Sequence, residues 1–183
     1  MIHFNNVYYF IDKFDRNEIL NLDNKINIIY RNYKSKNKDS DIQKIKYFCK
    51  ITKKKIFISN DIKLALKYNL DGLYLPAFNN KLNYKNLNLR KNFKIIGSAH
   101  NIRELKIKEK QGCTSIFVSP LFYNPKNEYS LGIIKFNLVC INASVDIIAL
   151  GGINKKNIRL LLSTNVSGFA SISWIKKNRL TLK

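Results

Sequence analysis

Eight short β-rich runs recur along this chain, and they limit its possible folds more than any other feature. In chain order they are VYYFI (7–11), INIIYRN (26–32), KIFISN (55–60), GLYLPA (72–77), KIIGSA (94–99), SIFVSP (115–120), DIIALGG (146–152) and GFASISWI (168–175). Most are continuously apolar rather than alternating, which is typical of parallel strands covered by helices. Segments of helical spacing or short connections separate them. A strand–crossover–strand unit repeated to eight strands predicts a compact α/β fold, the (β/α)8 TIM barrel, with an open doubly wound sheet as the alternative.

Two parts of the pattern are weaker than a full barrel requires. Residues 76–94 form only a poor candidate for the fourth helix, and the chain stops eight residues after the eighth run, so we expect the last outer helix to be missing. The first and eighth strands would then be poorly covered, which makes a homodimer across this gap a hypothesis. The length of 183 residues, 45% of them apolar, predicts a single domain over residues 1–183.

The chain is strongly basic, with a formal charge of +21 from 33 Lys and Arg against 12 Asp and Glu. A basic nucleic-acid-binding protein is therefore one alternative. The lysines are scattered, however, and only KITKKK (50–55) forms a run, so we consider nucleic acid an unlikely partner.

Location and covalent chemistry follow from what the sequence lacks. The three cysteines have no CxxC spacing, which argues against a disulfide framework and against a zinc site. No apolar run reaches membrane-spanning length, and no signal peptide is recognisable, so we expect a cytoplasmic protein without membrane contact.

Polar residues gather where the predicted strands end, which is where the chemistry of a TIM barrel takes place. They are Arg31, Asn60, Asp61, Asn79, Ser98, His100, Ser119, Asn124, Gly151, Gly152, Ser171 and Ser173. The Arg31 guanidinium at the barrel mouth would suit a bidentate grip on phosphate oxygens, although a surface arginine is the alternative. For Asn60 and Asp61, a helix cap is the alternative to contact with a ligand. His100 is either a general acid or base or a structural hydrogen-bonding residue.

The stretch DIIALGGINKKNIRLLL (146–162) places two glycines between a strand and a helical segment. Residues without Cβ let the backbone approach a ligand closely, and a helix N-terminus favours an anion. The loops after strands seven and eight form the recurrent phosphate pocket of this architecture. We therefore favour a phosphate at Gly151 and Gly152 over the alternative, a glycine turn that only allows close packing.

These residues resemble those of the thiamine-phosphate synthase family and of its relatives, the TenI-type thiazole tautomerases. The resemblance covers most of the chain and is clearest in FISNDIKLALKYNLDGLYLP (57–76), KIIGSAHNIRELKIKEKQGCTSIFVSPLF (94–122) and DIIALGGINKKNIRLLLSTNVSGFASISWI (146–175). It implies a barrel that joins hydroxymethylpyrimidine diphosphate to a thiazole phosphate in thiamine biosynthesis, with Mg²⁺ assisting.

The resemblance also implies roles for individual residues. Arg31 and Asn60 would contact the diphosphate, Asp61 would bind Mg²⁺, and Ser98 would face the pyrimidine; Arg31, Asn60 and Ser98 are thus the candidate catalytic residues. The thiazole phosphate would be held largely through backbone N–H groups, at Gly151, Gly152, Ile172 and Ser173.

Several positions depart from the family pattern. Ile29 stands where the family has Gln, Tyr33 where it has Lys, and Asn79 where it has a second metal-binding acid. Lys126 would substitute for a displaced phosphate-contacting lysine, and Ser119 stands where the tautomerases place a histidine. Two further functions therefore stay open: a TenI-like or non-catalytic barrel that binds a thiazole phosphate or a related phosphorylated ligand, and the nucleic-acid binder above.

Overall fold

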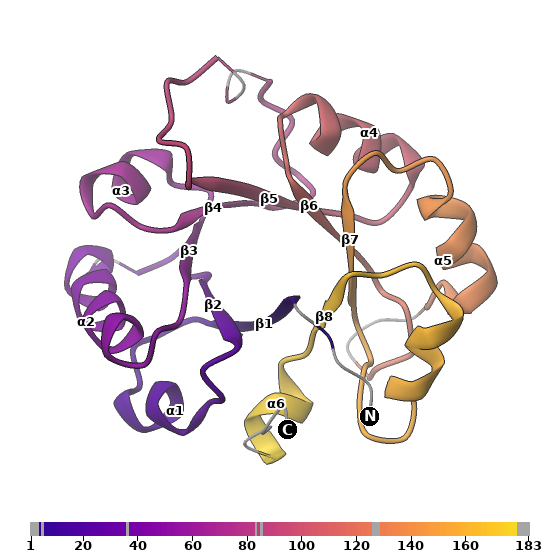
Figure 1. The fold of residues 1–183 in the computed structure, drawn as a ribbon, viewed down its shortest axis with the longest axis horizontal. Coiled ribbons are helices and arrows are strands. Elements are labelled where there is room, and N and C mark those ends of the chain that lie inside the picture. Colours follow the sequence, from indigo (N-terminus) through magenta and orange to yellow (C-terminus); the bar gives the residue numbers. More distant parts are fainter. Residues whose placement is uncertain are drawn as a thin grey trace.

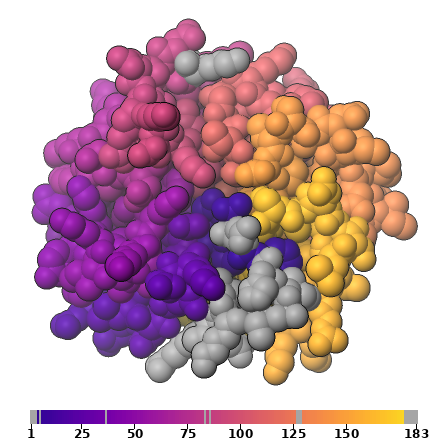
Figure 2. Space-filling model, viewed as in Figure 1, coloured from indigo at the N-terminus to yellow at the C-terminus, as the bar shows by residue number. Residues whose placement is uncertain are grey.

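Eight parallel strands close into a barrel in which every strand pairs with its neighbours in chain order and β8 pairs with β1. The computed structural model describes residues 4, 6–35, 37–82, 84, 86–125 and 129–178. Viewed down its axis, the strands form the centre and the helices surround them (Figure 1). The colours of Figure 2 run once around the molecule from indigo to yellow. The first and last strands, β1 and β8, are hydrogen-bonded to each other. The predicted TIM barrel is confirmed.

Each β-rich run contains one strand, and most strands end before the polar residues of the run. The strands are β1 (Asn6–Ile11), β2 (Ile26–Tyr30), β3 (Ile56–Ser59), β4 (Gly72–Leu75), β5 (Lys94–Ala99), β6 (Ser115–Val118), β7 (Asp146–Leu150) and β8 (Gly168–Ala170). The polar residues that follow the strands within these runs lie at the carboxyl rim, where the chain leaves the sheet.

The helices that cover the barrel are uneven in length. They are α1 (Arg16–Asn21), α2 (Lys38–Ile51), α3 (Ile62–Lys67), α4 (Ile102–Lys110), α5 (Gly132–Cys140), the 3₁₀ helix η1 (Ile158–Ser163) and α6 (Ser173–Asn178). The described residues between β4 and β5 contain no helix, which confirms the poor fourth helix.

The prediction for the last outer helix has to be corrected. A six-residue helix, α6, follows β8 and lies outside the barrel beside α1 (Figure 1). Lys176 of α6 lies 3.4 Å from the Glu18 carboxylate of α1, and the Tyr9 hydroxyl donates to the same oxygen at 2.6 Å. The Trp174 ring stacks on Phe169 of β8. These contacts tether α6 to the first and last strands, where the sequence had suggested an uncovered gap.

Aromatic rings fill much of the barrel interior. The residues that point inward are Tyr8, Phe10, Ile29, Phe57, Tyr74, Ile96, Phe117, Ile148 and Ala170. The rings of Tyr8, Phe10 and Tyr74 all meet Phe117 edge to face, at centroid distances of 5.0–5.9 Å, a favourable aromatic geometry. A ligand must therefore bind above these rings, at the rim.

The other buried apolar residues form a second core between the strands and the helices. Cys49, Cys113 and Cys140 are free. No helix in the described part of the chain is long and apolar enough to cross a membrane.

Candidate functional site

The closed barrel brings the predicted site residues to one end of the molecule. All eight strands are parallel, so their carboxyl ends share one rim. Arg31 and Asn60 directly follow β2 and β3, Ser98 lies near the end of β5, and the glycine pair follows β7. Ile172 follows β8, and Ser173 is the first residue of α6 rather than part of the eighth strand. Lys126 lies outside the described residues.

Arg31 lies over the interior of the barrel. Its amide donates to the Ile11 carbonyl at 2.7 Å, which continues the ladder between β2 and β1. Its guanidinium carbon lies 4.8 Å from the centre of the Phe10 ring, while the residue stays exposed. An aromatic face attracts a cation that lies over it. The N–H groups at the edge of the guanidinium can still donate hydrogen bonds to a ligand. The Arg31 guanidinium is thus oriented at the barrel mouth.

Asn60, Asp61 and Asn79 form what we call the β3–β4 rim. Asn60 has a φ of 59°, a left-handed conformation that asparagine tolerates, and its amide donates to the Tyr74 carbonyl at 2.8 Å. The Asn79 side-chain amide donates to Asn60 Oδ1 at 2.5 Å and to the Tyr84 hydroxyl at 2.9 Å. Asn79 is buried, and its Oδ1 accepts from the Lys81 amide at 2.9 Å. The Asn60 and Asn79 side chains are therefore bonded to each other.

Asp61 caps helix α3, as the alternative interpretation of its position predicted. Its Oδ1 accepts from the Leu64 amide at 3.1 Å. No group of three or more His, Cys, Asp or Glu side chains in the described residues could hold a metal ion. Mg²⁺ prefers an octahedral shell of oxygens, and here the protein offers one half-buried carboxylate that already serves as a cap. These residues alone do not fit a protein-held Mg²⁺ site.

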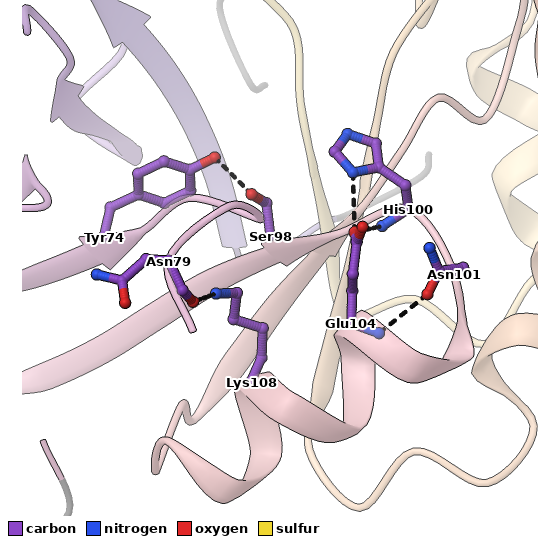
Figure 3. Close-up of polar contacts among 7 residues, drawn as sticks. All are labelled: Tyr74, Asn79, Ser98, His100, Asn101, Glu104 and Lys108. Atoms are coloured by element: carbon purple, nitrogen blue, oxygen red, sulfur yellow. Dashed lines mark hydrogen bonds and ion pairs between the residues drawn. The ribbon is translucent and has the colours of Figure 1, made fainter. Parts of the chain in front are cut away.

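The polar groups inside the mouth are hydroxyls. The Tyr74 hydroxyl donates to Ser98 Oγ at 2.9 Å, and both residues are buried (Figure 3). Burial raises the pKa of Tyr74 to about 12, so this hydroxyl keeps its proton at neutral pH. The Tyr33 hydroxyl lies 2.9 Å from Ser59 Oγ. Tyr33 and Ile29 thus leave a hydroxyl and an apolar side chain where the family pattern has a Lys and a Gln.

The glycine pair is required first by packing. Gly151 and Gly152 have φ values of 97° and 68°, a region that L side chains rarely adopt. A Cβ on Gly151 would lie 2.8 Å from Pro120 Cα, and one on Gly152 would overlap the Phe122 carbonyl. The loop after β6 therefore packs directly on this turn, as the packing alternative predicted.

The same turn presents its amides. Its carbonyls are occupied, because Phe122 N donates to Gly151 O at 3.0 Å and Asn157 Nδ2 donates to Gly152 O at 2.9 Å. The N–H groups of Gly151, Gly152, Ile172 and Ser173 donate to no acceptor within the described part of the chain. Close packing and free amides thus coexist, so the phosphate interpretation stays a prediction.

These amides border a cleft of about 740 Å³, which we call the β7–β8 cleft. It is lined by residues 123–125, 150–156 and 170–174, from the loops after β6, β7 and β8. Lys155 and Lys156 are part of the lining and make it basic, whereas Tyr123 and Trp174 supply aromatic surface. The α-helix expected after the glycines is instead a six-residue 3₁₀ helix, so a helix dipole contributes less here than the sequence suggested.

His100 is engaged with the start of α4. Its Nδ1 lies 2.9 Å from Glu104 Oε2, and its amide donates to the same oxygen at 2.7 Å (Figure 3). Asn101 caps the helix by accepting from the Glu104 amide at 3.0 Å. This arrangement favours the structural alternative for His100.

Sequence reasoning missed the buried polar residues behind the rim. Lys108 and Gln111 are both fully buried. Lys108 Nζ donates to the Asn79 carbonyl at 2.6 Å, and burial lowers the pKa of this ammonium. A signal was present, because Lys108 follows the buried Leu105 by three residues and so lies on the same face of α4.

The fold and these features define a (β/α)8 barrel with a cleft at its carboxyl rim. The thiamine monophosphate synthase family model matches residues 19–175. This chain belongs to that family.

Curated relatives agree with this assignment. The chain is 30% identical over 181 residues to a thiamine-phosphate synthase of Prochlorococcus marinus subsp. pastoris, a match that covers 92% of this chain and 50% of the relative. It is 29% identical over 127 residues to the thiamine-phosphate synthase of Clostridium novyi, covering 67% of this chain and 62% of the relative. The chain thus spans about half the length of these curated relatives.

A solved structure has the same fold. The thiamine phosphate pyrophosphorylase from Pyrococcus furiosus superposes with a TM-score of 0.76 at 19% identity, and the match covers 96% of this chain and 92% of that one.

Proposed function

We propose that this chain is a thiamine-phosphate-synthase-like transferase that joins hydroxymethylpyrimidine diphosphate to a thiazole phosphate. The observation that carries this proposal is the shared rim. The free amides of the β7–β8 cleft and the Arg31 guanidinium lie at one end of the barrel, so two anionic substrates could be held with their reacting ends facing each other. Family membership supports the same reaction.

The chemistry asks the protein mainly to hold oxyanions and to orient the partners. The thiazole nitrogen donates its electron pair to the methylene carbon of the pyrimidine, and a C–N bond forms. The bond between that carbon and the diphosphate oxygen breaks, and its electron pair leaves on the diphosphate. Negative charge on the leaving oxygens therefore grows in the transition state, where fixed cationic donors stabilise it most.

Arg31 is the cation we assign to the leaving diphosphate. Its guanidinium is held above the Phe10 ring, which orients the donors before substrate binds. A guanidinium forms paired, charge-assisted hydrogen bonds to phosphate oxygens. Asn60 would contact the same group, and Ser98 would face the pyrimidine, with its hydroxyl oriented by Tyr74.

The β7–β8 cleft would hold the thiazole phosphate. Its phosphate would accept from the amides of Gly151, Gly152, Ile172 and Ser173, and Lys155 and Lys156 would add long-range attraction. Tyr123 and Trp174 line the same cleft and suit a heteroaromatic ring. Lys126 follows this lining in the chain and is retained as a candidate phosphate contact.

Mg²⁺ enters this proposal only together with the substrate. When bound, such an ion would neutralise charge on the diphosphate. Asp61 would be its one carboxylate contact, and diphosphate oxygens and water would have to complete its shell.

The test is formation of thiamine phosphate from both substrates with Mg²⁺. We expect turnover in the unmodified protein, a fall of about 100-fold in Arg31→Ala and a loss in Asp61→Ala. Turnover left unchanged by both substitutions would show that the site is wrongly assigned.

A second candidate function is a barrel that binds a thiazole phosphate without transfer. The β3–β4 rim favours it, because Asn79 has no carboxylate and its amide is bonded to Asn60 and Tyr84. Thiazole phosphate would then raise the melting temperature, while no thiamine phosphate would form.

A further inference from the structure

Lys108 places a cation in the interior of the molecule without a carboxylate partner. Its side chain is fully buried, and none of the ion pairs formed by the described residues includes it. Its Nζ donates to two neutral oxygens, the Asn79 carbonyl at 2.6 Å and Gln111 Oε1 at 3.0 Å. A buried charge is costly in free energy, and apolar replacements of buried charges are often neutral or stabilising. Stability alone is therefore a weak reason for this lysine.

The surrounding structure is arranged to admit the lysine. A Cβ on Gly97 of β5 would lie 2.9 Å from Lys108 Cδ, so the stem of the lysine crosses the strand at a glycine. Figure 3 shows the side chain reaching from α4 to the segment that follows β4. Gln111 Nε2 donates to the carbonyls of Asn79 and Lys81, at 2.9 and 2.8 Å. An ammonium and an amide thus gather the backbone oxygens of this segment.

The chain of contacts continues to the rim of the barrel. Asn79, whose backbone binds Lys108, donates from its side chain to Asn60 Oδ1 at 2.5 Å. Asn60 is a proposed diphosphate contact. A change in the cation would therefore reach the diphosphate end of the site through a single residue, Asn79.

We propose that Lys108 is a positioning residue: a protein-borne cation that orders residues 79–81 and, through Asn79, the Asn60 side chain. In this proposal, Lys108 holds residues 79–81 in place, as a metal ion bound at position 79 would. This agrees with the poor fit of these residues to a protein-held Mg²⁺. A metal at the Asn79 side chain would also lie close to the ammonium, and like charges repel strongly in a buried setting. The kinetic consequence rests on the proposed function, whereas the structural one does not.

Hydrogen exchange of the backbone amides tests the structural consequence. We expect Lys108→Met to speed exchange of the Lys81 amide, which is bonded to Asn79 Oδ1, by about tenfold or more. Lys54→Met is the matched control, because Lys54 is also buried but precedes β3 at the opposite end of the barrel. Whatever its effect on global stability, it should leave exchange at residues 79–81 unchanged. Equal exchange at Lys81 in both variants would overturn the proposal.

If Lys108→Met does not fold, Gln111→Leu can be compared with the unmodified protein in the same hydrogen-exchange measurement. It leaves the ammonium in place and removes the amide donor to residues 79 and 81. Faster exchange confined to residues 79–82 is expected, and unchanged exchange there would contradict the proposal.

Mn²⁺ binding, measured by calorimetry on the protein without substrate, tests the replacement of a metal. We expect Asn79→Asp alone to bind Mn²⁺ weakly, and Asn79→Asp combined with Lys108→Met to bind it at least about tenfold more tightly. Equal Mn²⁺ affinity in the single and double variants would refute the role of the ammonium.

Steady-state kinetics separates this inference from the proposed function. If the chain is a transferase, Lys108→Met should raise KM for the diphosphate substrate about tenfold and leave KM for the thiazole phosphate unchanged. Changed exchange with no turnover in any variant would leave the positioning role intact and remove the transferase. Turnover with unchanged exchange and an unchanged KM would support the transferase and remove the positioning role of Lys108.

Discussion

The β7–β8 cleft and the β3–β4 rim lie at the same end of the barrel but use different parts of the chain. The cleft is lined by residues whose backbone N–H groups donate to no acceptor in the described part of the chain, and its glycines are also demanded by packing against the loop after β6. The rim presents the side chains of Asn60, Asp61 and Asn79, which are already bonded to one another or to the start of a helix.

This difference makes the two halves of the proposed site unequally sensitive to substitution. An amide is present whatever the side chain is, so a backbone site survives most substitutions that keep the turn. A side-chain site is lost with one substitution, and Ile29, Tyr33 and Asn79 are three such changes on this side of the mouth. The comparison predicts that thiazole phosphate binding is robust and that diphosphate binding is the sensitive half.

The largest expected effect is that of Arg31→Ala. Losing a bidentate, charge-assisted contact of roughly 3 kcal/mol should lower kcat/KM for the diphosphate substrate about 100-fold. Thiazole phosphate should still raise the melting temperature, because the β7–β8 cleft is untouched. Arg159→Ala removes an exposed arginine from η1 and serves as the charge control. Equal losses in the two variants would break the comparison.

Gly152→Ala should damage the cleft instead. The new methyl group would overlap the Phe122 carbonyl at a positive φ, so we expect about 2 kcal/mol less stability and about 30-fold weaker thiazole phosphate binding. Urea unfolding and calorimetry measure the two effects. Gly132→Ala is the control, since Gly132 also has a positive φ, of 63°, but open space around it. A similar binding loss there would mean that strain alone, and not the cleft, is responsible.

Asp61→Asn separates the cap from the metal contact. Asparagine caps helices as well as aspartate does, so stability should change by less than about 0.5 kcal/mol. Turnover should fall about tenfold and require more Mg²⁺, because one carboxylate contact to the metal and diphosphate is lost. Asp61→Ala should also lower stability, by about 1 kcal/mol. If the Mg²⁺ dependence of Asp61→Asn is unaltered, Asp61 caps helix α3 but does not contact the metal.

Tyr33→Lys should produce the smallest effect and sharpen the comparison from the other side. It returns a cation to the mouth, and we expect KM for the diphosphate substrate to fall about fivefold. Tyr33→Phe, which removes only the hydroxyl contact with Ser59, should leave KM within twofold of its starting value. A gain in both variants would attribute the effect to the broken hydrogen bond rather than to charge.

Much of the fold and part of the candidate site were predictable from the sequence. The barrel followed from continuously apolar runs, since strands buried on both faces leave that pattern. The rim residues followed from parallel strand ends, and the Asp61 cap from its place before α3. Lys108 was missed because charged residues are rarely buried. Tyr74 was missed because a tyrosine in an apolar strand is expected to belong to the hydrophobic core. The 3₁₀ form of the helix after the glycines and the short α6 depend on packing that local spacing does not record.

The sequence by itself determined the order of strands and the set of polar residues at their ends, because both follow from local hydrophobic period and chain direction. Only the tertiary structure decided which of those residues are committed to one another. Hydrogen bonds between residues distant in sequence, such as Lys108 to Asn79, depend on the close approach of α4 and the segment after β4, and that approach exists only once the barrel has closed.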